Sequence, residues 1–490
     1  MTGMSCTDSP AAAVAKLSSA FLDAHRSAGC YKRELIDEIA ALSLSRYENE
    51  ALTATRALFT SLIEPLADSF EPASVGLYNR IFAQLSAACM RRESEFANQL
   101  RSFGVGTEEL LFKRAEELRA AVHSAPSRRS SLHRVERVLV LSRVTIGADV
   151  AVTSVIVERL KQELPEAEIV IVGGGKLAEL FGGDRRFRFK EAAYQRSGSL
   201  RHRLLSWLEL LKAIREMSRE LDEFAIIDPD SRLTQLGVFP LNPASHSDRC
   251  LFFPSREFRS ETSECLAALA AEWSGALFGS ERRVTPTLAL KKADVQIGAD
   301  LASRLRNQGA HHIATMNFGL GGNTAKQLSE SFEQSLVAAL LANGATVILD
   351  KGAGEEEARR VDRLLERLRG EWARSSSLCI LELDEEKMRE ALSAPGVQPN
   401  LVVWSGRVGL LSAIIAAGDS YLGYDSAGQH IAAALGVPCI DIFSGTPSPR
   451  FIERWTPHGS NKVNVVAAQE FTSEKHVLAR VLNVWHKLAD

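Results

Sequence analysis

Long apolar runs, paired cysteines and an excess of one charge are all missing from this chain. No apolar run approaches the roughly 20 residues that a bilayer-spanning helix needs. The formal net charge of −3 gives no sign of a nucleic-acid partner. The first residues lack a basic start followed by an apolar core, so we expect no secretory signal. These absences predict a cytoplasmic protein that binds no nucleic acid.

The cysteines exclude two further kinds of structure. Seven are scattered along the chain, and none belongs to a Cys-x-x-Cys pair. An odd number without regular spacing indicates reduced thiols rather than a disulfide framework or a structural zinc site. Hydrophobic residues make up 45% and charged residues 24%, which is ordinary for a globular protein with a sizeable core.

At 490 residues the chain is too long for one ordinary domain, and its first part differs from the rest. Up to residue 123, apolar residues recur every three or four positions and no strand is evident. This pattern predicts an all-α N-terminal domain over 1–130, followed by a Ser- and Arg-rich linker at 124–134. Acceptor binding, oligomerisation and docking of a partner all remain open as its role.

Beyond the linker, short β-branched apolar runs alternate with amphipathic segments. This alternation predicts an α/β fold with parallel sheets covered by helices on both faces. The pattern restarts after 282–300, so we expect two tandem Rossmann-like domains over 135–295 and 300–475 and a C-terminal helix over 474–490. Ligands of such domains bind outside the carboxyl ends of the strands. The expected strands are 137–144, 168–175, 224–230, 250–255, 311–318, 345–352, 378–384, 420–426 and 438–445.

Residues 423–436, GYDSAGQHIAAALG, place Asp425, Ser426 and His430 where an alanine-rich helix should begin. Asp and Ser are good N-cap residues, so simple capping is one interpretation. A helix N-terminus that binds phosphate is the other. The stretch taken alone does not choose between them.

Three segments together resemble glycosyltransferase family 9, the heptosyltransferase-like enzymes with the GT-B fold. They are VLVLSRVTIGADVAVTSVI (138–156), NFGLGGNTAKQLSESFEQSLVAAL (317–340) and GYDSAGQHIAAALGVPCIDIFSGTPSPRFIERWTPHG (423–459). The likeness extends over about 137–485 and leaves the helical N-terminus outside it. The chain departs from the family at Ala148, directly before the aspartate, and at Ala427, since the family has glycine at both places.

The resemblance implies an inverting, metal-independent glycosyltransferase that uses no cofactor. Its donor would be a nucleoside-diphosphate sugar, with ADP-heptose as the family default. Its acceptor would be a glycan of the lipopolysaccharide core, a lipid-linked glycan or, given the helical extension, a protein. The two departures motivate a second hypothesis, a sugar-nucleotide-binding or scaffold protein that has lost turnover. A GT-B nucleotide-sugar epimerase is a third.

Asp149 is the candidate catalytic base. It lies in the turn after the first expected strand, where a carboxylate at the ligand-binding edge can accept the proton of an acceptor hydroxyl. Spacing alone favours an N-cap for a helix over 150–162. The resemblance places the family's catalytic aspartate at this position and reverses that preference.

A cation and helix N-termini can stabilise a leaving diphosphate without a metal. Lys326 follows the glycine-rich loop 319–325 at the start of a helix, so its ammonium could reach a diphosphate; a solvated lysine is the alternative. Thr446, in the segment FSGT, could line the same pocket. The expected donor-binding residues are Gly322, Thr324, Lys326, Asp425, Ser426, Gly428, His430 and Thr446.

Three residues are expected on the acceptor side: Arg143, Asp230 and Arg232. The resemblance aligns Arg143 with a basic family position, whereas the other two belong to a strand-end turn. The sequence DPD (228–230) looks like a metal-binding Asp-x-Asp motif, but the tandem layout disfavours that interpretation and we expect no metal. The basic segment 185–203 is expected to be a solvated face, with an acceptor platform or contact with the inner face of an anionic membrane as alternatives.

Overall fold

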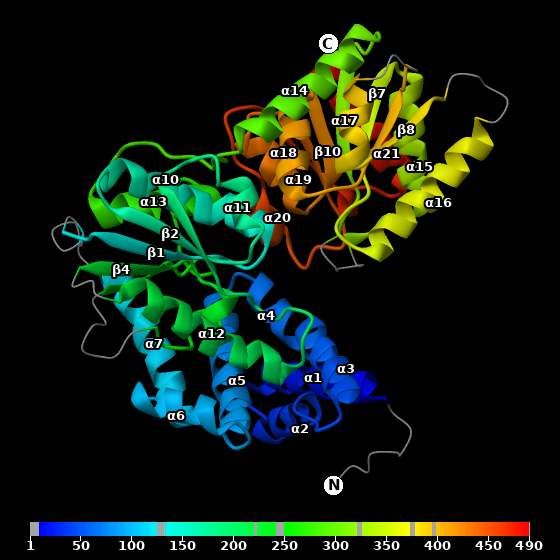
Figure 1. Ribbon diagram of the computed structural model, residues 1–490. Coiled ribbons are helices and arrows are strands. Elements are labelled where there is room, and N and C mark those ends of the chain that lie inside the picture. Colours follow the sequence, from blue (N-terminus) through cyan, green and yellow to red (C-terminus); the bar gives the residue numbers. More distant parts are fainter. Residues whose placement is uncertain are drawn as a thin grey trace.

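The computed structural model describes residues 9–124, 132, 134–219, 223–241, 249–320, 326–372, 378–393 and 398–489. The described residues form a helical region and two α/β halves, which follow one another along the chain (Figure 1). None of the described helices is both long and apolar enough to cross a membrane.

The described residues of the helical region form seven α-helices before the first strand, and the all-helical character that the spacing of apolar residues predicts is confirmed. Helix boundaries follow local chemistry: the Ser9 side chain caps the first helix, Gly29 ends it in a left-handed conformation, and Pro72 starts the fifth. A π-helical turn, η1 (Phe59–Ile63), joins the third helix to the fourth. The helices are α1 (Pro10–Ala28), α2 (Arg33–Ser43), α3 (Glu48–Leu58), α4 (Glu64–Asp68), α5 (Pro72–Met90), α6 (Ser94–Ser102) and α7 (Glu108–Ser124).

The first α/β half has a five-stranded parallel sheet in the order β3-β2-β1-β4-β5. Its strands are β1 (Arg137–Leu141), β2 (Glu168–Gly173), β3 (Phe187–Glu191), β4 (Phe224–Asp228) and β5 (Cys250–Phe252). Its helical segments are α9 (Ile146–Ala148), η2 (Asp149–Thr153), α10 (Ser154–Glu163), α11 (Leu177–Leu180), α12 (Leu200–Ser218), η3 (Arg232–Thr234) and α13 (Leu266–Phe278).

The second half has a seven-stranded parallel sheet in the order β12-β11-β10-β6-β7-β9-β8. The strands are β6 (His312–Asn317), β7 (Ala345–Asp350), β8 (Ile380–Leu383), β9 (Leu401–Trp404), β10 (Ser420–Tyr424), β11 (Cys439–Phe443) and β12 (Val463–Ala467). The helical segments are α14 (Lys292–Asn307), α15 (Glu330–Ala342), α16 (Glu355–Glu371), α17 (Glu385–Ser393), α18 (Val408–Ala417), α19 (Ala427–Ala434), α20 (Pro449–Trp455), η6 (Ala468–Glu470) and α21 (Glu474–Ala489).

The α/β class is confirmed, and all nine expected strands are present, but three strands were not predicted. β3, β9 and β12 are short, and β3 carries alternating charged residues because it is the edge strand of its sheet. The expected boundary at 295–300 falls inside α14. This helix packs on α18 of the second half, where a Cβ at Gly298 would meet the backbone of Ala413.

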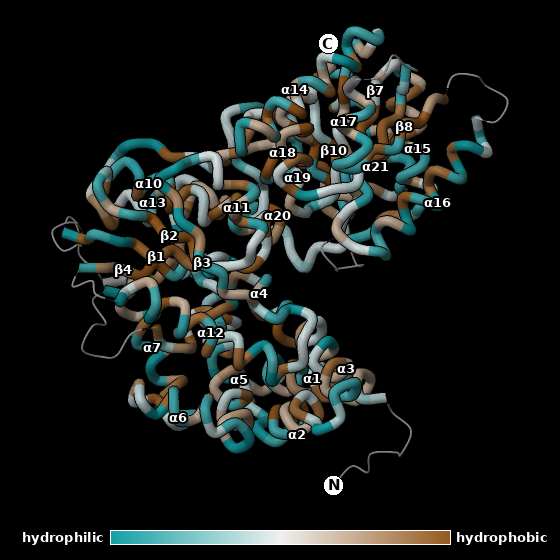
Figure 2. Tube along the Cα trace, viewed as in Figure 1, coloured by the Kyte–Doolittle hydropathy of each residue, from teal (hydrophilic) through white to brown (hydrophobic). Residues whose placement is uncertain are grey.

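The helical region is not a separate globule with its own core. Its apolar side chains share one continuous cluster with α12 and with one face of the first sheet, through residues such as Leu139, Val170 and Ile226. The other face of that sheet packs against α10 and α13. Figure 2 shows the hydrophobic strands β1 and β2 lying between these helical layers. The helical region is therefore fixed directly beneath the first sheet.

Candidate functional site

Both sheets have a topological switch point, and most of the predicted site residues lie at the two switch points. In the first sheet it lies between β1 and β4, and in the second between β6 and β10. Residues after the carboxyl ends of these strands are where open α/β sheets bind ligands. Asp149 and Arg143 follow β1, Asp230 follows β4, and Asp425 follows β10.

The two switch points meet at Gly147. A Cβ at this position would lie 3.2 Å from His430 Cδ2, 3.2 Å from the Ser426 carbonyl oxygen and 3.3 Å from Ala427 Cα. Such distances are tighter than ordinary van der Waals contacts, so the glycine permits the turn after β1 to lie directly on the N-terminus of α19. The structure thus brings the first and third signature segments of the sequence into contact.

Asp149 is not an N-cap, and that alternative is wrong. The helix begins at Ile146 with Thr145 as its N-cap, and Asp149 has helical dihedral angles. Its carboxylate instead turns back to the end of β1 and accepts three hydrogen bonds: from Ser142 Oγ (2.6 Å), the Arg143 amide (2.7 Å) and Thr153 Oγ1 (2.7 Å). Burial raises the pKa of Asp149 from 3.8 to about 6, while these three donors oppose the rise.

Arg143 lies beside Asp149 and is almost wholly buried. Within the described residues its Nη1 has no hydrogen-bond partner, and its guanidinium lies 5.8 Å from the centre of the Trp455 ring. Burial, with a smaller contribution from Arg256, lowers the pKa of Arg143 to about 10. The next residue, Val144, has a left-handed φ of 79°, which is rare for a β-branched residue and typical of strained loops at functional sites.

On the donor side, the ammonium of Lys326 forms an ion pair with the carboxylate of Asp425 and also donates to the Asp425 carbonyl oxygen at 3.3 Å. Burial raises the pKa of Asp425, and the charge of Lys326 opposes that rise. Asp441, fully buried on the adjacent strand β11, has no hydrogen-bond partner among the described residues. Burial and the neighbouring Asp425 raise the pKa of Asp441 well above its ordinary value.

The N-terminus of α19 is closed by a capping box, as the capping interpretation predicts. The Ser426 amide donates to Gln429 Oε1 at 2.9 Å, and the Ser426 side chain accepts from the Gln429 amide. Gly428 is required for internal packing, because a Cβ there would overlap the hydroxyl of Tyr421. His430 packs edge-on against Trp455 at 6.0 Å, and burial lowers its pKa to about 3, so it is a neutral imidazole.

The remaining donor-side predictions are less central. Thr446 follows β11, and its hydroxyl accepts a hydrogen bond from Gln469 Nε2 at 3.1 Å. Gly322 and Thr324 lie outside the described residues. The hydrogen bond of Thr446 does not connect it to the contact around Gly147.

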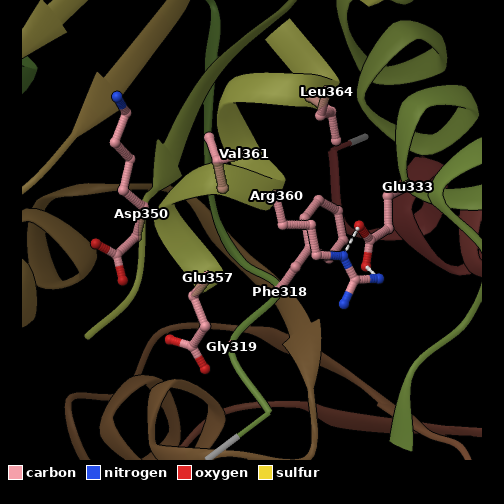
Figure 3. Close-up of a pocket in the computed structure, with 9 residues that line it drawn as sticks. Phe318, Gly319, Glu333, Asp350, Glu357, Arg360, Val361 and Leu364 are labelled. Atoms are coloured by element: carbon pink, nitrogen blue, oxygen red, sulfur yellow. Dashed lines mark hydrogen bonds and ion pairs between the residues drawn. The ribbon is translucent and has the colours of Figure 1, made fainter. Parts of the chain in front are cut away.

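A small cavity lies past the carboxyl ends of β6 and β7 (Figure 3). Its volume is about 10 Å³, which suits one water molecule and no nucleotide. Glu357 fixes the adjoining loops by accepting from the Leu320 amide and the Ala353 amide, both at 2.9 Å. Beside it, Arg360 Nε donates to the buried Glu333 at 2.8 Å. The edge of the second sheet is thus closed around charged side chains.

Of the acceptor-side residues, Arg232 contacts the helical region, whereas Asp230 is held within the first half. Asp230 accepts hydrogen bonds from Ser255 Oγ (2.7 Å) and Arg256 Nη1 (2.6 Å). Arg232 donates to the hydroxyl of Tyr78, on α5, at 2.9 Å. Asp228 is held by the Ser231 amide and the Thr234 hydroxyl. Among the described residues no group of three or more His, Cys, Asp and Glu side chains is arranged to hold a metal ion.

The basic segment 185–203 is largely neutralised within the protein. Arg188, Lys190 and Arg201 form ion pairs with Glu168, Glu216 and Glu93 respectively. Arg186 donates to backbone carbonyls, and the guanidinium of Arg203 covers the ring of Phe59 at 3.8 Å. These contacts favour a structural role for the segment.

Sequence reasoning missed Trp455 and a short stretch of the helical region. The Trp455 ring contacts Arg143, His430 and Phe70, so one side chain links the first half, the second half and the helical region. Asp68 lies among Arg256, Arg232, Lys326 and Asp425. The sequence WTP (455–457), near the end of the third segment, was a signal for Trp455, whereas nothing local marks Asp68 or Phe70.

Comparison with known proteins finds likeness only at the level of structure. No family model and no curated protein sequence matches the chain. A glycosyltransferase family 9 protein from Veillonella parvula superposes with a TM-score of 0.53 at 14% identity, over 72% of this chain and 97% of that one. The chain has the GT-B fold.

Two Escherichia coli proteins also superpose over 72% of the chain. The first is ADP-heptose LPS heptosyltransferase II, with a TM-score of 0.46, 16% identity and 98% of its chain covered. The second is heptosyltransferase WaaC with ADP, with a TM-score of 0.47, 14% identity and 100% of its chain covered. The superposition on the Veillonella parvula protein covers 72% of this chain, and the remaining share is comparable in length to the helical region. That region is therefore an addition to the GT-B body.

Proposed function

We propose that the chain is a glycosyltransferase that transfers a sugar, with inversion and without a metal, from a nucleoside-diphosphate donor to a hydroxyl acceptor. The observation that carries this proposal is the contact at Gly147, within a GT-B fold. It places Asp149 on one side of the junction and the Lys326–Asp425 pair with the N-terminus of α19 on the other. ADP-heptose is the first donor to test, and a glycan, a lipid-linked glycan or a protein is the acceptor class.

In the proposed reaction the acceptor oxygen attacks the anomeric carbon as the bond from that carbon to the diphosphate oxygen breaks. The acceptor proton passes to Asp149. A pKa of about 6 suits this step, because the carboxylate is ionised at neutral pH and still basic enough to take up a proton. Lys326 and the positive N-terminal end of α19 would stabilise the departing diphosphate. Lys326 must then exchange Asp425 for a phosphate oxygen.

One observation favours a second function, the binding of a sugar nucleotide without turnover. Both oxygens of Asp149 are already engaged by three donors, so an acceptor hydroxyl has to displace one of them. A protein that binds a sugar nucleotide but has lost turnover would tolerate a carboxylate whose two oxygens are already occupied.

A melting experiment followed by product analysis separates these functions. We expect a nucleoside diphosphate or its sugar, at a hundredfold excess over its dissociation constant, to stabilise the protein by about 2.7 kcal/mol. Mass spectrometry of the incubated donor then detects transfer or hydrolysis products if the protein is an enzyme. Stabilisation without product over hours supports the binding function. If no nucleotide changes the melting temperature, both functions are wrong.

A further inference from the structure

Residues 64–72 of the helical region, here called the bridging segment, cross between the two α/β halves. Phe70, at its centre, has a left-handed φ of 56°, which is uncommon for a bulky residue. Its buried ring lies 6.3 Å from Phe451 and 6.4 Å from Trp455, both of the second half. The surrounding packing therefore holds a strained backbone in one defined position.

Polar contacts fix the bridging segment on both sides of Phe70. The Ala67 carbonyl accepts a hydrogen bond from Arg256 Nε at 3.0 Å, and the same guanidinium holds Asp230 of the first half. Glu71 forms ion pairs with Arg450 of the second half and, at 3.8 Å, with Arg259. The segment is thus anchored to both halves. Ala67, directly before Asp68, is bonded to the first half, and Glu71, three residues after Asp68, is paired with the second.

Asp68, the last residue of α4, lies between these anchors. Burial raises its pKa, and the positive charges of Arg256, Arg232 and Lys326 oppose that rise, whereas Asp425 adds to it. Asp68 is therefore close to residues of both the acceptor side and the donor side. Within the described residues its half-buried carboxylate accepts no hydrogen bond, whereas Asp149 accepts three and Asp228 and Asp230 accept two each.

Resting on the function proposed above, we propose that Asp68 is an acceptor-binding residue, whose carboxylate receives hydroxyl groups of a polyhydroxylated acceptor. The helical region then contributes an acceptor-binding residue to the reaction site, beside the residues that the two α/β halves contribute.

The chemistry of Asp68 selects this class of ligand. The two oxygens of a carboxylate accept hydrogen bonds, and they suit two neighbouring hydroxyls of a sugar or polyol. A phosphate brought against the same carboxylate would be repelled by it. Anionic groups of a substrate belong instead near Lys326 and the unpartnered Nη1 of Arg143.

The test compares Asp68→Asn with the wild type and with Glu95→Gln, which removes the same charge from the exposed surface of α6. The dissociation constant of ADP is measured by calorimetry. ADP-heptose is then incubated with glycerol, D-glucose or D-mannose as acceptor, and mass spectrometry gives the ratio of glycoside to hydrolysed sugar.

We expect Asp68→Asn to lower this ratio at least tenfold, to change ADP binding less than threefold and to keep the wild-type melting temperature, with Asp68→Glu restoring part of the ratio. Glu95→Gln should match the wild type in all three measurements. An unchanged ratio in Asp68→Asn overturns the role of Asp68 alone. The role is also overturned if the wild type hydrolyses the donor but forms no glycoside with any of the three polyols. A wild type that binds ADP but never consumes the donor overturns the transferase function itself.

Discussion

Asp149 and Asp425 are two buried carboxylates at the carboxyl ends of parallel strands, one in each half of the molecule. Burial raises the pKa of both. Asp149 is held by three uncharged donors, two hydroxyls and an amide. Asp425 is held mainly by the ammonium of Lys326. The same cost of desolvation is thus offset by dipoles in the first half and by a full charge in the second.

The difference matters because the two arrangements suit different chemical steps. A carboxylate with a pKa of about 6, whose hydrogen-bond donors are all uncharged, can gain a proton near neutral pH without breaking an ion pair. An ion pair can instead exchange its anion, so that Lys326 binds an incoming diphosphate. The first half is therefore suited to proton transfer and the second to anion binding.

The largest expected effect comes from Asp149→Asn. Removing the proposed base should lower the rate of sugar transfer by about 10²- to 10⁴-fold, the usual contribution of general base catalysis. ADP binding should remain, since the donor contacts lie in the second half. The measurement is the initial rate of product formation together with calorimetric titration of ADP. Full transfer activity in this variant would show that Asp149 is not the base.

The pH dependence provides the control for this role. The Thr153 hydroxyl lowers the pKa of Asp149, so Thr153→Val should raise that pKa and move the acid limb of the rate profile to higher pH. Because the folded pKa is raised, the stability that Asp149 contributes is present below 3.8 and is lost as the pH rises through about 6. Asp149→Asn should abolish this part of the pH dependence of unfolding.

An intermediate effect is expected from Lys326→Met. Loss of a hydrogen bond to a charged group costs about 1.5–3 kcal/mol, so ADP should bind roughly 10- to 100-fold more weakly. The pKa of the vacated Asp425 should rise further, because burial still raises it and the opposing charge of Lys326 is gone. Lys292→Met, on the exposed surface of α14, is the matched control and should bind ADP like the wild type. Equal affinities in the two variants would remove Lys326 from the donor site.

The fold was predictable because its strands are short apolar runs separated by amphipathic helices, a pattern set by burial on both faces of a parallel sheet. The pattern failed at β3, where an edge strand carries charged residues, and at α14, whose polar start resembles a linker. The N-cap interpretation of Asp149 was wrong because the helix begins three residues earlier. The carboxylate accepts a hydrogen bond from the Arg143 amide, which precedes the helix.

The site was only partly predictable, since its contacts join distant segments. Local sequence indicated Asp149, Lys326, Asp425 and His430. It gave no indication that Lys326 pairs with Asp425, or that Gly147 lies against His430. Nor could it indicate that Asp68 interacts with Lys326 and Asp425, because that depends on how the helical region packs under the first sheet.

The smallest effect tests whether the two carboxylates share one site at all. In Gly147→Ala the new methyl group would lie 3.2 Å from His430 Cδ2, so the two halves must separate by a few tenths of an ångström. We expect a loss of about 1–2 kcal/mol in the free energy of unfolding, measured in urea, and a proportionally larger fall in transfer rate. Gly174→Ala, whose Cβ has no atom within 4 Å, should change stability by less than about 0.5 kcal/mol. If Gly147→Ala behaves like Gly174→Ala in both measurements, the contact does not persist in solution. Asp149 and Asp425 would then belong to two separate sites. Proton transfer by the first half and diphosphate binding by the second could not be steps of one reaction.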